Sequence, residues 1–238
     1  MARTRRRRAG SATAGDQEAP LDVERIVAAA LALLDQVGLE GLTMRRLAER
    51  LGIQAATLYW YVRDKHELLS LLAEAICAEM RPPAPNTPWR AQMEALMGEY
   101  RRVLRAHRDA AHVLAATVPA GAYRLQLVDL ALGAVRAAGF EEWEASRAAR
   151  LVVDFTTGFV QEEDVMAARP APETTERVSH KADTLHLLTI AEAPAQEYPN
   201  LAVLGPYLAD YDGDARFRFG LSVALDGLEQ RRGATGSA

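Results

Sequence analysis

The sequence has little cysteine, few aromatic residues and no long apolar run. Its one cysteine, Cys77, excludes an internal disulfide framework and a zinc site built from cysteines, and it suits a reducing compartment. No run approaches the roughly 18 apolar residues that a membrane span requires, and no apolar stretch follows the basic N-terminus as a secretory signal would need. We therefore expect a globular, cytoplasmic protein that has no membrane partner.

Catalytic and cofactor-binding motifs are also missing. The histidines are scattered, without the HExxH spacing or any similar pattern of metal ligands. The sequence contains no Walker loop, no dinucleotide fingerprint and no G-x-S-x-G elbow. Nothing in it supports an enzyme, a metal site or a bound cofactor.

The charge is unevenly distributed along the chain. The net charge of −4 argues against a nucleic-acid partner, but residues 1–10 contain five arginines and no acid. The first 79 residues hold 11 basic and 11 acidic side chains, so the acidic excess, 21 against 17, lies beyond them. Residues 1–20 read as a flexible basic leader, either a solvated tail or an arm that contacts DNA.

Helical periodicity dominates, and no stretch alternates strongly enough to predict a strand, so the expected fold class is all-α. Four prolines between residues 82 and 88 must end a helix and predict a domain boundary, with one domain over 21–81 and a larger one over 88–232. The expected helices are 23–37, 43–51, 54–61, 64–80, 89–107, 109–117, 120–138, 141–169, 174–190, 200–211 and 214–231. Gly38 is expected to stop the first helix, Thr43 to cap the second, and Asp64 and Glu67 to form a capping box at the start of the fourth.

Two short helices in the first domain have the dimensions of a helix-turn-helix. They are joined through Leu51-Gly52-Ile53, where Gly52 supplies the positive φ of a tight turn. The second of them presents small and polar side chains suited to base edges, and Arg45 on the first suits guanine. The residues expected to read bases are Arg45, Gln54, Ala55, Ala56, Thr57 and Tyr59; those suited to phosphates are Thr43, Tyr59, Trp60, Tyr61 and Lys65.

Residues 41–69, GLTMRRLAERLGIQAATLYWYVRDKHELL, resemble the DNA-binding domain of the TetR family of bacterial repressors. The Leu58-Tyr59-Trp60 signature is similar to that of the tetracycline-repressor class. His107-Arg108-Asp109 and Phe219-Gly220-Leu221 resemble that class's regulatory domain. The resemblance implies an N-terminal helix-turn-helix DNA-binding domain followed by a larger helical domain for ligand binding and dimerisation.

The resemblance also implies a homodimer and a ligand pocket. Helices 141–169 and 214–231, which are rich in small residues, would form a four-helix bundle between two subunits. The alternative for these helices is packing within the subunit's own core, which some of the small side chains form. The pocket candidates carried over from the family are Met93, Leu96, Tyr100, Leu114, Thr117, Val118, Pro119, Phe155, Phe159 and Glu162.

Three of these positions depart from the tetracycline repressors. Leu114 replaces the histidine that binds the drug–magnesium chelate, Leu96 replaces a polar drug contact, and Val118 replaces an arginine. A lone Glu162 beside Thr117 does not make a metal site. We therefore expect a more apolar effector than tetracycline–magnesium.

The sequence as a whole favours a ligand-responsive, homodimeric repressor that binds a palindromic operator in double-stranded DNA. A small effector would release it, with the helix 64–80 as the pivot. Two alternatives stay open. An enzyme or small-molecule carrier would keep the helix-turn-helix only as a fold element, and an architectural DNA binder would have a filled interior in its second domain.

Overall fold

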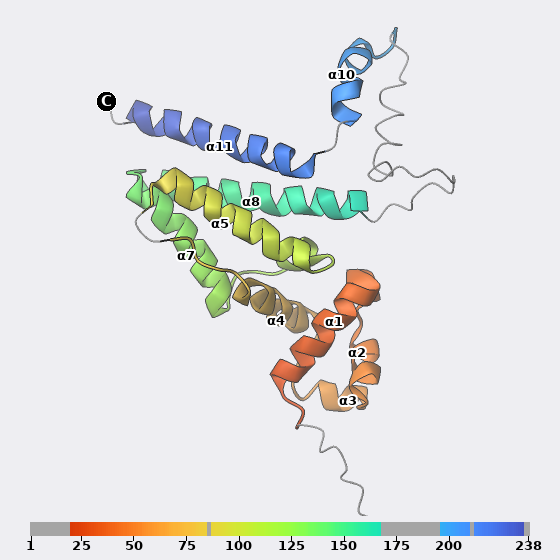
Figure 1. Ribbon diagram of the computed structural model, residues 1–238. Helices are drawn as coiled ribbons and strands as arrows, with labels where there is room; N and C mark the ends of the chain where they lie inside the picture. Colours follow the sequence, from red (N-terminus) through yellow and green to blue (C-terminus); the bar gives the residue numbers. More distant parts are fainter. Residues whose placement is uncertain (1–19, 85–86, 168–195, 210–211, 236–238) are drawn as a thin grey trace, which may run out of the picture.

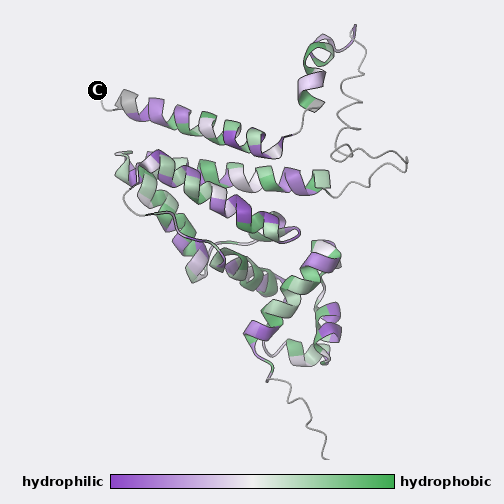
Figure 2. Cartoon of the chain, viewed as in Figure 1, coloured by the Kyte–Doolittle hydropathy of each residue, from purple (hydrophilic) through white to green (hydrophobic). Residues whose placement is uncertain are grey.

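The computed structural model describes residues 20–84, 87–167, 196–209 and 212–235, and every regular element in these segments is a helix (Figure 1). This confirms the all-α fold class. The helix expected over 174–190 lies outside the described residues. Most helices carry both apolar and polar residues (Figure 2), and the apolar residues that face inward form the core.

Four helices form the N-terminal part. Asp22, Thr43 and Asp64 begin three of them, because each side chain accepts a hydrogen bond from a backbone N–H three residues ahead, at 2.8, 3.2 and 2.8 Å. Leu47 and Leu58 are fully buried and hold the short helices against their neighbours. The bounds are α1 Val23–Gly41, α2 Met44–Leu51, α3 Ala55–Leu58 and α4 Lys65–Ala78.

Three details differ from the sequence expectation. The chain bends at Gly38, with φ of 71°, and then adds one more turn to α1 instead of stopping. The expected capping box is only half formed, because the Glu67 carboxylate accepts from the N–H of Arg63 at 2.7 Å rather than from that of Asp64. Helix α3 is one turn long, since Tyr59 ends it in a turn.

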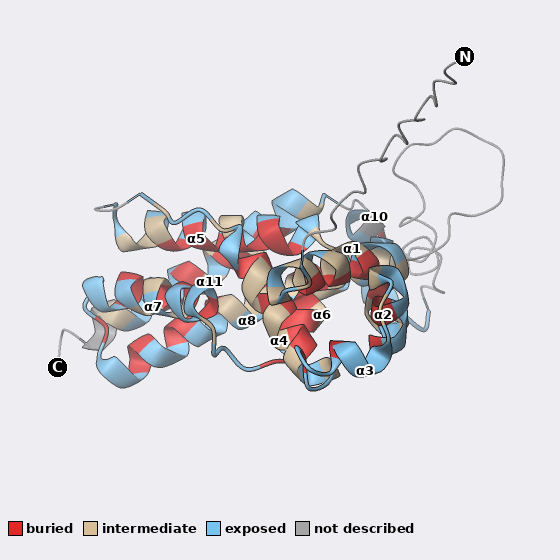
Figure 3. Ribbon diagram, turned by 90° about the horizontal axis from the view of Figure 1, so that it is seen from below, coloured by how far each residue is buried: buried red, intermediate tan, exposed pale blue. Residues whose placement is uncertain are grey.

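Helices α5, α6, α7, α8 and α11 form the body, in which α5, α7 and α8 pack together while α11 lies along α8 and α10 stands apart (Figure 1). Helix α4 packs against α6 and α7 as well as against α1, so it joins the two parts. Buried residues gather on the inward faces of α4, α5 and α6 (Figure 3). The bounds are α5 Trp89–Ala106, α6 Ala110–Ala115, α7 Ala122–Ala137, α8 Glu142–Ala167, α10 Pro199–Ala209 and α11 Gly213–Thr235.

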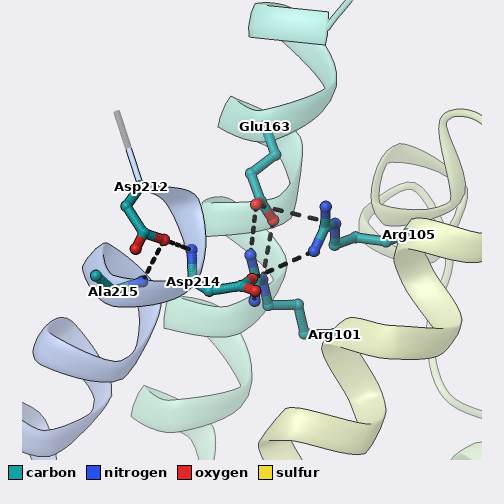
Figure 4. Close-up of polar contacts among 6 residues, drawn as sticks. All are labelled: Arg101, Arg105, Glu163, Asp212, Asp214 and Ala215. Carbon is teal, nitrogen blue, oxygen red and sulfur yellow. Dashed lines mark hydrogen bonds and ion pairs between the residues drawn. The ribbon is translucent and has the colours of Figure 1, made fainter. Parts of the chain in front are cut away.

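A polar cluster and an aromatic cluster fasten α11 to the body. Arg101 of α5 is 8% exposed and donates to both Glu163 oxygens, at 3.0 and 2.6 Å, and to Asp214 at 2.7 Å (Figure 4). This guanidinium lowers the pKa of the Asp214 carboxyl. The rings of Phe155 and Phe217 stack beside it, with centroids 5.8 Å apart.

Candidate nucleic-acid interface and ligand cavity

The turn between α2 and α3 has the geometry of a helix-turn-helix. Gly52 adopts φ of 68°, and its N–H bonds to the carbonyl of Glu49 at 3.2 Å, so the chain leaves α2 sharply. The N–H of Ile53 then bonds to the carbonyl of Ala48 at 3.0 Å. Leu58 is fully buried beneath α3, which leaves the polar face of that helix directed to solvent.

The side chains expected to read bases are exposed. A DNA groove can therefore reach α3 without any rearrangement of the core. The three aromatic residues after Leu58 are also exposed, Trp60 most of all at 89%. They lie in the turn that follows α3, whereas the sequence predicts a helix that continues through residue 61. The exposed set comprises Thr43, Arg45, Gln54, Ala55, Ala56, Thr57, Tyr59, Trp60 and Tyr61.

The two basic residues among the predicted DNA contacts, Arg45 and Lys65, differ in their surroundings. Arg45 bonds to Glu49 at 2.9 Å, and both side chains are exposed, so little free energy holds the guanidinium there. Lys65 is half-buried, and its Nζ donates to the carbonyl of Leu39 at 3.1 Å. One of the three N–H donors of this ammonium is therefore used by α1, and two remain for the expected phosphate contact. Arg46 and Arg50 of α2 are exposed too, although neither is among the predicted DNA contacts.

The body contains a cavity of about 800 Å³, within the range of small-molecule sites. Its wall is mostly apolar and comes from α5, α6, α7, α8 and the segment that follows α6. The lining residues are Tyr100, Leu114, Ala115, Thr117, Val118, Pro119, Arg124, Leu125, Val128, Ala131, Leu132, Ser146, Ala149, Arg150, Val153, Asp154 and Thr157.

Five of the ten pocket candidates line this cavity: Tyr100, Leu114, Thr117, Val118 and Pro119. The structure places the other five elsewhere. Met93 and Leu96 are fully buried in the core. Phe155, Phe159 and Glu162 lie on the side of α8 that faces α11, where the two rings pack on Phe217 and the carboxylate bonds to Arg216 at 3.1 Å.

The helical period explains this division. Arg150, Val153 and Thr157 recur at three- and four-residue spacing and share the cavity face of α8, whereas Phe155 and Phe159 belong to another face. None of the ten pocket candidates lies on α7, although that helix is itself predicted. The signal was present, since the α7 lining residues also recur at helical spacing: Arg124, Leu125, Val128, Ala131 and Leu132.

Polar groups in the cavity wall are few and mostly bonded to one another. The Tyr100 hydroxyl lies 3.1 Å from that of Thr157, and burial raises the pKa of Tyr100 to about 12. Arg150 is 77% exposed and pairs with Asp154 at 2.6 Å. Arg124 is only 7% exposed and donates to the hydroxyl of Thr117 at 2.7 Å.

Short polar contacts join the N-terminal head, formed by α1 to α4, to the body. Asp109, just before α6, accepts from the N–H of Leu39 in α1 at 2.7 Å. The N–H of Arg108 bonds to Asp35 of α1 at 3.0 Å. On α4, Glu74 accepts from the first backbone N–H groups of α7, at 2.6 and 3.1 Å. A shift of α6 or α7 would therefore displace α1 and α4 through these hydrogen bonds.

Asp109, His112 and Asp164 cluster near this joint, with ligand-type atoms within 4.8 Å of one another. His112 Nδ1 and Asp164 Oδ2 are 3.8 Å apart, and neither has a hydrogen-bond partner in the structure as described. Tetrahedral zinc ligands at 2.0–2.2 Å lie about 3.5 Å apart, so the His112–Asp164 pair is wider than a zinc site requires. Burial raises the pKa of Asp164 to about 6.

These features define a class of protein. An exposed helix-turn-helix reads DNA, a separate helical body encloses a small-molecule cavity, and α4 and α6 connect the two. Such an arrangement belongs to regulators whose DNA affinity responds to a ligand.

Comparisons with known proteins identify the family. The sequence matches the bacterial regulatory proteins of the tetR family over residues 26–72 and the tetracyclin repressor-like C-terminal domain over residues 82–232. It is 36% identical over 215 residues to the tetracycline repressor protein class A from transposon 1721 of Escherichia coli, covering 89% of this chain and 92% of that protein.

Solved structures are similar as well. ActR from Streptomyces coelicolor in complex with actinorhodin superimposes with a TM-score of 0.75 at 32% identity, over 89% of this chain and 96% of that one. Mycobacterium smegmatis BioQ gives 0.63 at 28% identity, over 87% and 98%, and BioQ has also been solved with its double-stranded DNA operator.

The chain belongs to the TetR family. This confirms the resemblance and the function drawn from it, a ligand-responsive regulator that binds DNA. Transcriptional regulation is the activity of this family, and nothing in the comparisons points to catalysis. No helix in the described segments is long and apolar enough to cross a membrane.

Proposed function

We propose that the protein is a homodimeric repressor that binds a palindromic operator and leaves it when a small, largely apolar effector enters the cavity. Residues 21–81 serve as the DNA-binding domain and residues 88–232 as the regulatory domain. The observation that carries the proposal is the position of α6. Asp109, at its start, holds α1, and Leu114, near its end, lines the cavity.

The coupling follows from the shortness of α6. It spans only Ala110–Ala115, so a displacement at the cavity end must move its start unless the helix itself deforms. The start is bonded to Leu39, and Lys65 of α4 bonds to the carbonyl of the same residue at 3.1 Å. An effector that fits only one position of α6 therefore selects one spacing of the two DNA-binding domains.

The dimer would cover the apolar surface that a single chain leaves exposed. Phe219 and Val223 of α11 are 73% and 53% exposed, and Leu151 of α8 is 49% exposed. Helix α10 stands apart from the body (Figure 1), with Tyr207 77% exposed. Apolar patches of this kind mark association surfaces. The stripe formed by Phe217, Leu221, Leu225 and Leu228 is buried within the chain's own core and is not available to a partner.

The wall of the cavity argues against tetracycline–magnesium as the effector. Leu114 supplies no metal ligand, and Glu162 lies outside the cavity on the α11 side of α8. A filled interior, which an architectural DNA binder would have, is not what the body contains. A mostly apolar molecule that fits about 800 Å³ suits the site better.

A reporter strain tests the proposal. The promoter beside the protein's own gene is fused to a fluorescent protein, and a panel of apolar small molecules is screened for induction. Val153→Trp, which places an indole in the cavity, should keep repression and lose induction by every active compound. Induction of the Val153→Trp strain at the same concentrations as the wild type would contradict a role for this cavity.

A further inference from the structure

We propose that the effector carries an acid group, such as a carboxylate or sulfonate, and that Arg124 binds it inside the cavity. This inference rests on the proposed function, because it names the chemistry of the ligand for the same site. It departs from a purely apolar effector, since it requires one anionic group on an otherwise apolar molecule.

The Arg124 guanidinium is buried without an ionic partner in the part of the chain that the structure describes. It donates to the Thr117 hydroxyl at 2.7 Å and to the carbonyls of Leu114 and Thr117, both at 3.2 Å. All three acceptors are neutral. The Glu74 carboxylate bonds to the backbone N–H of Arg124 and forms no ion pair with the guanidinium.

A buried charge needs a counter-charge. Desolvation of a guanidinium costs several kcal/mol, and neutral acceptors offset only part of that cost. The carbonyls at the end of α6 need hydrogen-bond donors, but they do not need a positive charge, so a neutral amide would satisfy them. The charge of Arg124 therefore has no structural use in the unliganded wall. Two further N–H donors of its five remain for an anion.

Arg150 provides the contrast within the same cavity. Its guanidinium is 77% exposed and bonds to Asp154 at 2.6 and 2.7 Å, so its charge is both solvated and neutralised. The two arginines thus divide into a paired one in contact with solvent and an unpaired one in the interior. An anionic ligand gains most from the interior one, because water competes least there.

The backbone of Arg124 is fixed in place, as a binding residue requires. Glu74 of α4 accepts from its N–H at 3.1 Å and from that of Tyr123 at 2.6 Å. The side chain therefore starts from a position anchored to the helix that joins the body to the DNA-binding domain. An anion bound to Arg124 would therefore act on the contact between α4 and α7 as well as on the end of α6.

Two fluorescent probes with one skeleton test the inference. 1-Anilinonaphthalene-8-sulfonate carries a sulfonate, and N-phenyl-1-naphthylamine is its neutral counterpart. Both are titrated into wild type, Arg124→Gln, Arg124→Lys and the control Arg136→Gln, which changes an exposed arginine of α7 that does not line the cavity, with circular dichroism melts to confirm folding. Val153→Trp reports how much of each signal comes from the cavity.

We expect Arg124→Gln to weaken the sulfonate probe by roughly tenfold, the loss of one charge-assisted hydrogen bond, and to leave the neutral probe within about twofold. Arg124→Lys should recover part of the affinity, and Arg136→Gln should change neither probe. Equal effects of Arg124→Gln on both probes would overturn the inference while leaving the pocket in place. Binding of neither probe in a Val153-dependent manner would contradict the pocket itself, and the inference with it.

A second measurement needs no variant, in case Arg124→Gln does not fold. Decanoate and decanol compete with N-phenyl-1-naphthylamine for the wild-type cavity at neutral pH. Decanoate should displace the probe at the lower concentration, although decanol is the more apolar of the two. Displacement by decanol alone, or at the lower concentration, would show that the cavity has no preference for an acid group.

Discussion

We expect individual side chains on α3 to decide which DNA sequence the protein selects. Thr57 is exposed on α3, and its hydroxyl and methyl group suit base edges, while Arg45 on α2 is held only by a surface ion pair. Thr57→Ala and Arg45→Ala should each reduce the preference for the operator over a scrambled duplex by about 1–3 kcal/mol. Fluorescence anisotropy with the two duplexes measures this directly.

Lys65 should behave differently. Its ammonium suits a phosphate, so Lys65→Ala should weaken binding to both duplexes alike. Because Nζ also bonds to the Leu39 carbonyl at 3.1 Å, a small loss of thermal stability should accompany the change. Arg136→Ala, an exposed arginine at the far end of α7, is the control and should change neither affinity. A sequence-dependent effect of Lys65→Ala would contradict a phosphate role.

Asp164 gives stability a pH dependence of predictable sign. Burial raises its pKa from 3.8 to about 6, and the nearby carboxylates of Asp109 and Glu163 add to this effect. The positive charges of His112 and Arg105 act in the opposite direction. The folded state then binds more protons than the unfolded state between these values, so this residue lowers stability as pH rises from about 4 to 6. Asp164→Asn should raise stability at pH 7.5 by roughly 1–2 kcal/mol and give no gain near pH 4.

Denaturant titrations at several pH values check this. Asp129→Asn, which removes an exposed carboxyl on α7, serves as the control. If Asp164→Asn gave the same gain at pH 4 as at pH 7.5, the raised pKa would be wrong. The Cys77 thiol is expected to be unreactive near neutral pH, because burial raises its pKa to about 12.

At the scale of elements, the contact between α8 and α11 depends on one small residue. A Cβ added to Gly220 would lie 2.6 Å from the Phe155 ring, inside the aromatic cluster that fastens α11. Overpacking of this kind costs about 1–3 kcal/mol, which exceeds the gain of up to about 1 kcal/mol from better helix propensity. Gly220→Ala should therefore lower the melting temperature.

Gly98→Ala is the matched control with the opposite sign. It lies within α5 with open space around its Cα, so alanine gains helix propensity there without a clash. Calorimetry of both variants should give a lower melting temperature for Gly220→Ala and a higher one for Gly98→Ala. A stabilised Gly220→Ala would show that α11 does not pack as described.

Elements were easier to predict from the sequence than the faces they present. Caps at Thr43 and Asp64, the turn at Gly52 and the apolar spacing marked the first four helices because each is a local signal. The cavity is not local. Leu96, a pocket candidate, is buried in the core, and Arg124, which lines the wall, was not singled out, because tertiary packing alone decides which face of a helix borders a void.

At the scale of the whole molecule, charge is divided according to function. The acidic excess lies beyond residue 79, where the cavity and the exposed apolar faces of α8 and α11 are found. The first 79 residues are balanced, and α2 and α3 present Arg45 and polar side chains to solvent. Net charge is therefore a poor guide to partners here, because an acidic body and a DNA-binding head are averaged together.

The most direct test of the account is the specificity of the full-length protein for DNA. A random duplex library is selected on the wild type, and the affinity of the recovered sequence is compared with that of its scrambled version at about 150 mM salt. The account predicts a palindrome bound by two chains, at least about 1,000-fold more tightly than the scrambled duplex. Equal affinity for the two duplexes would contradict it.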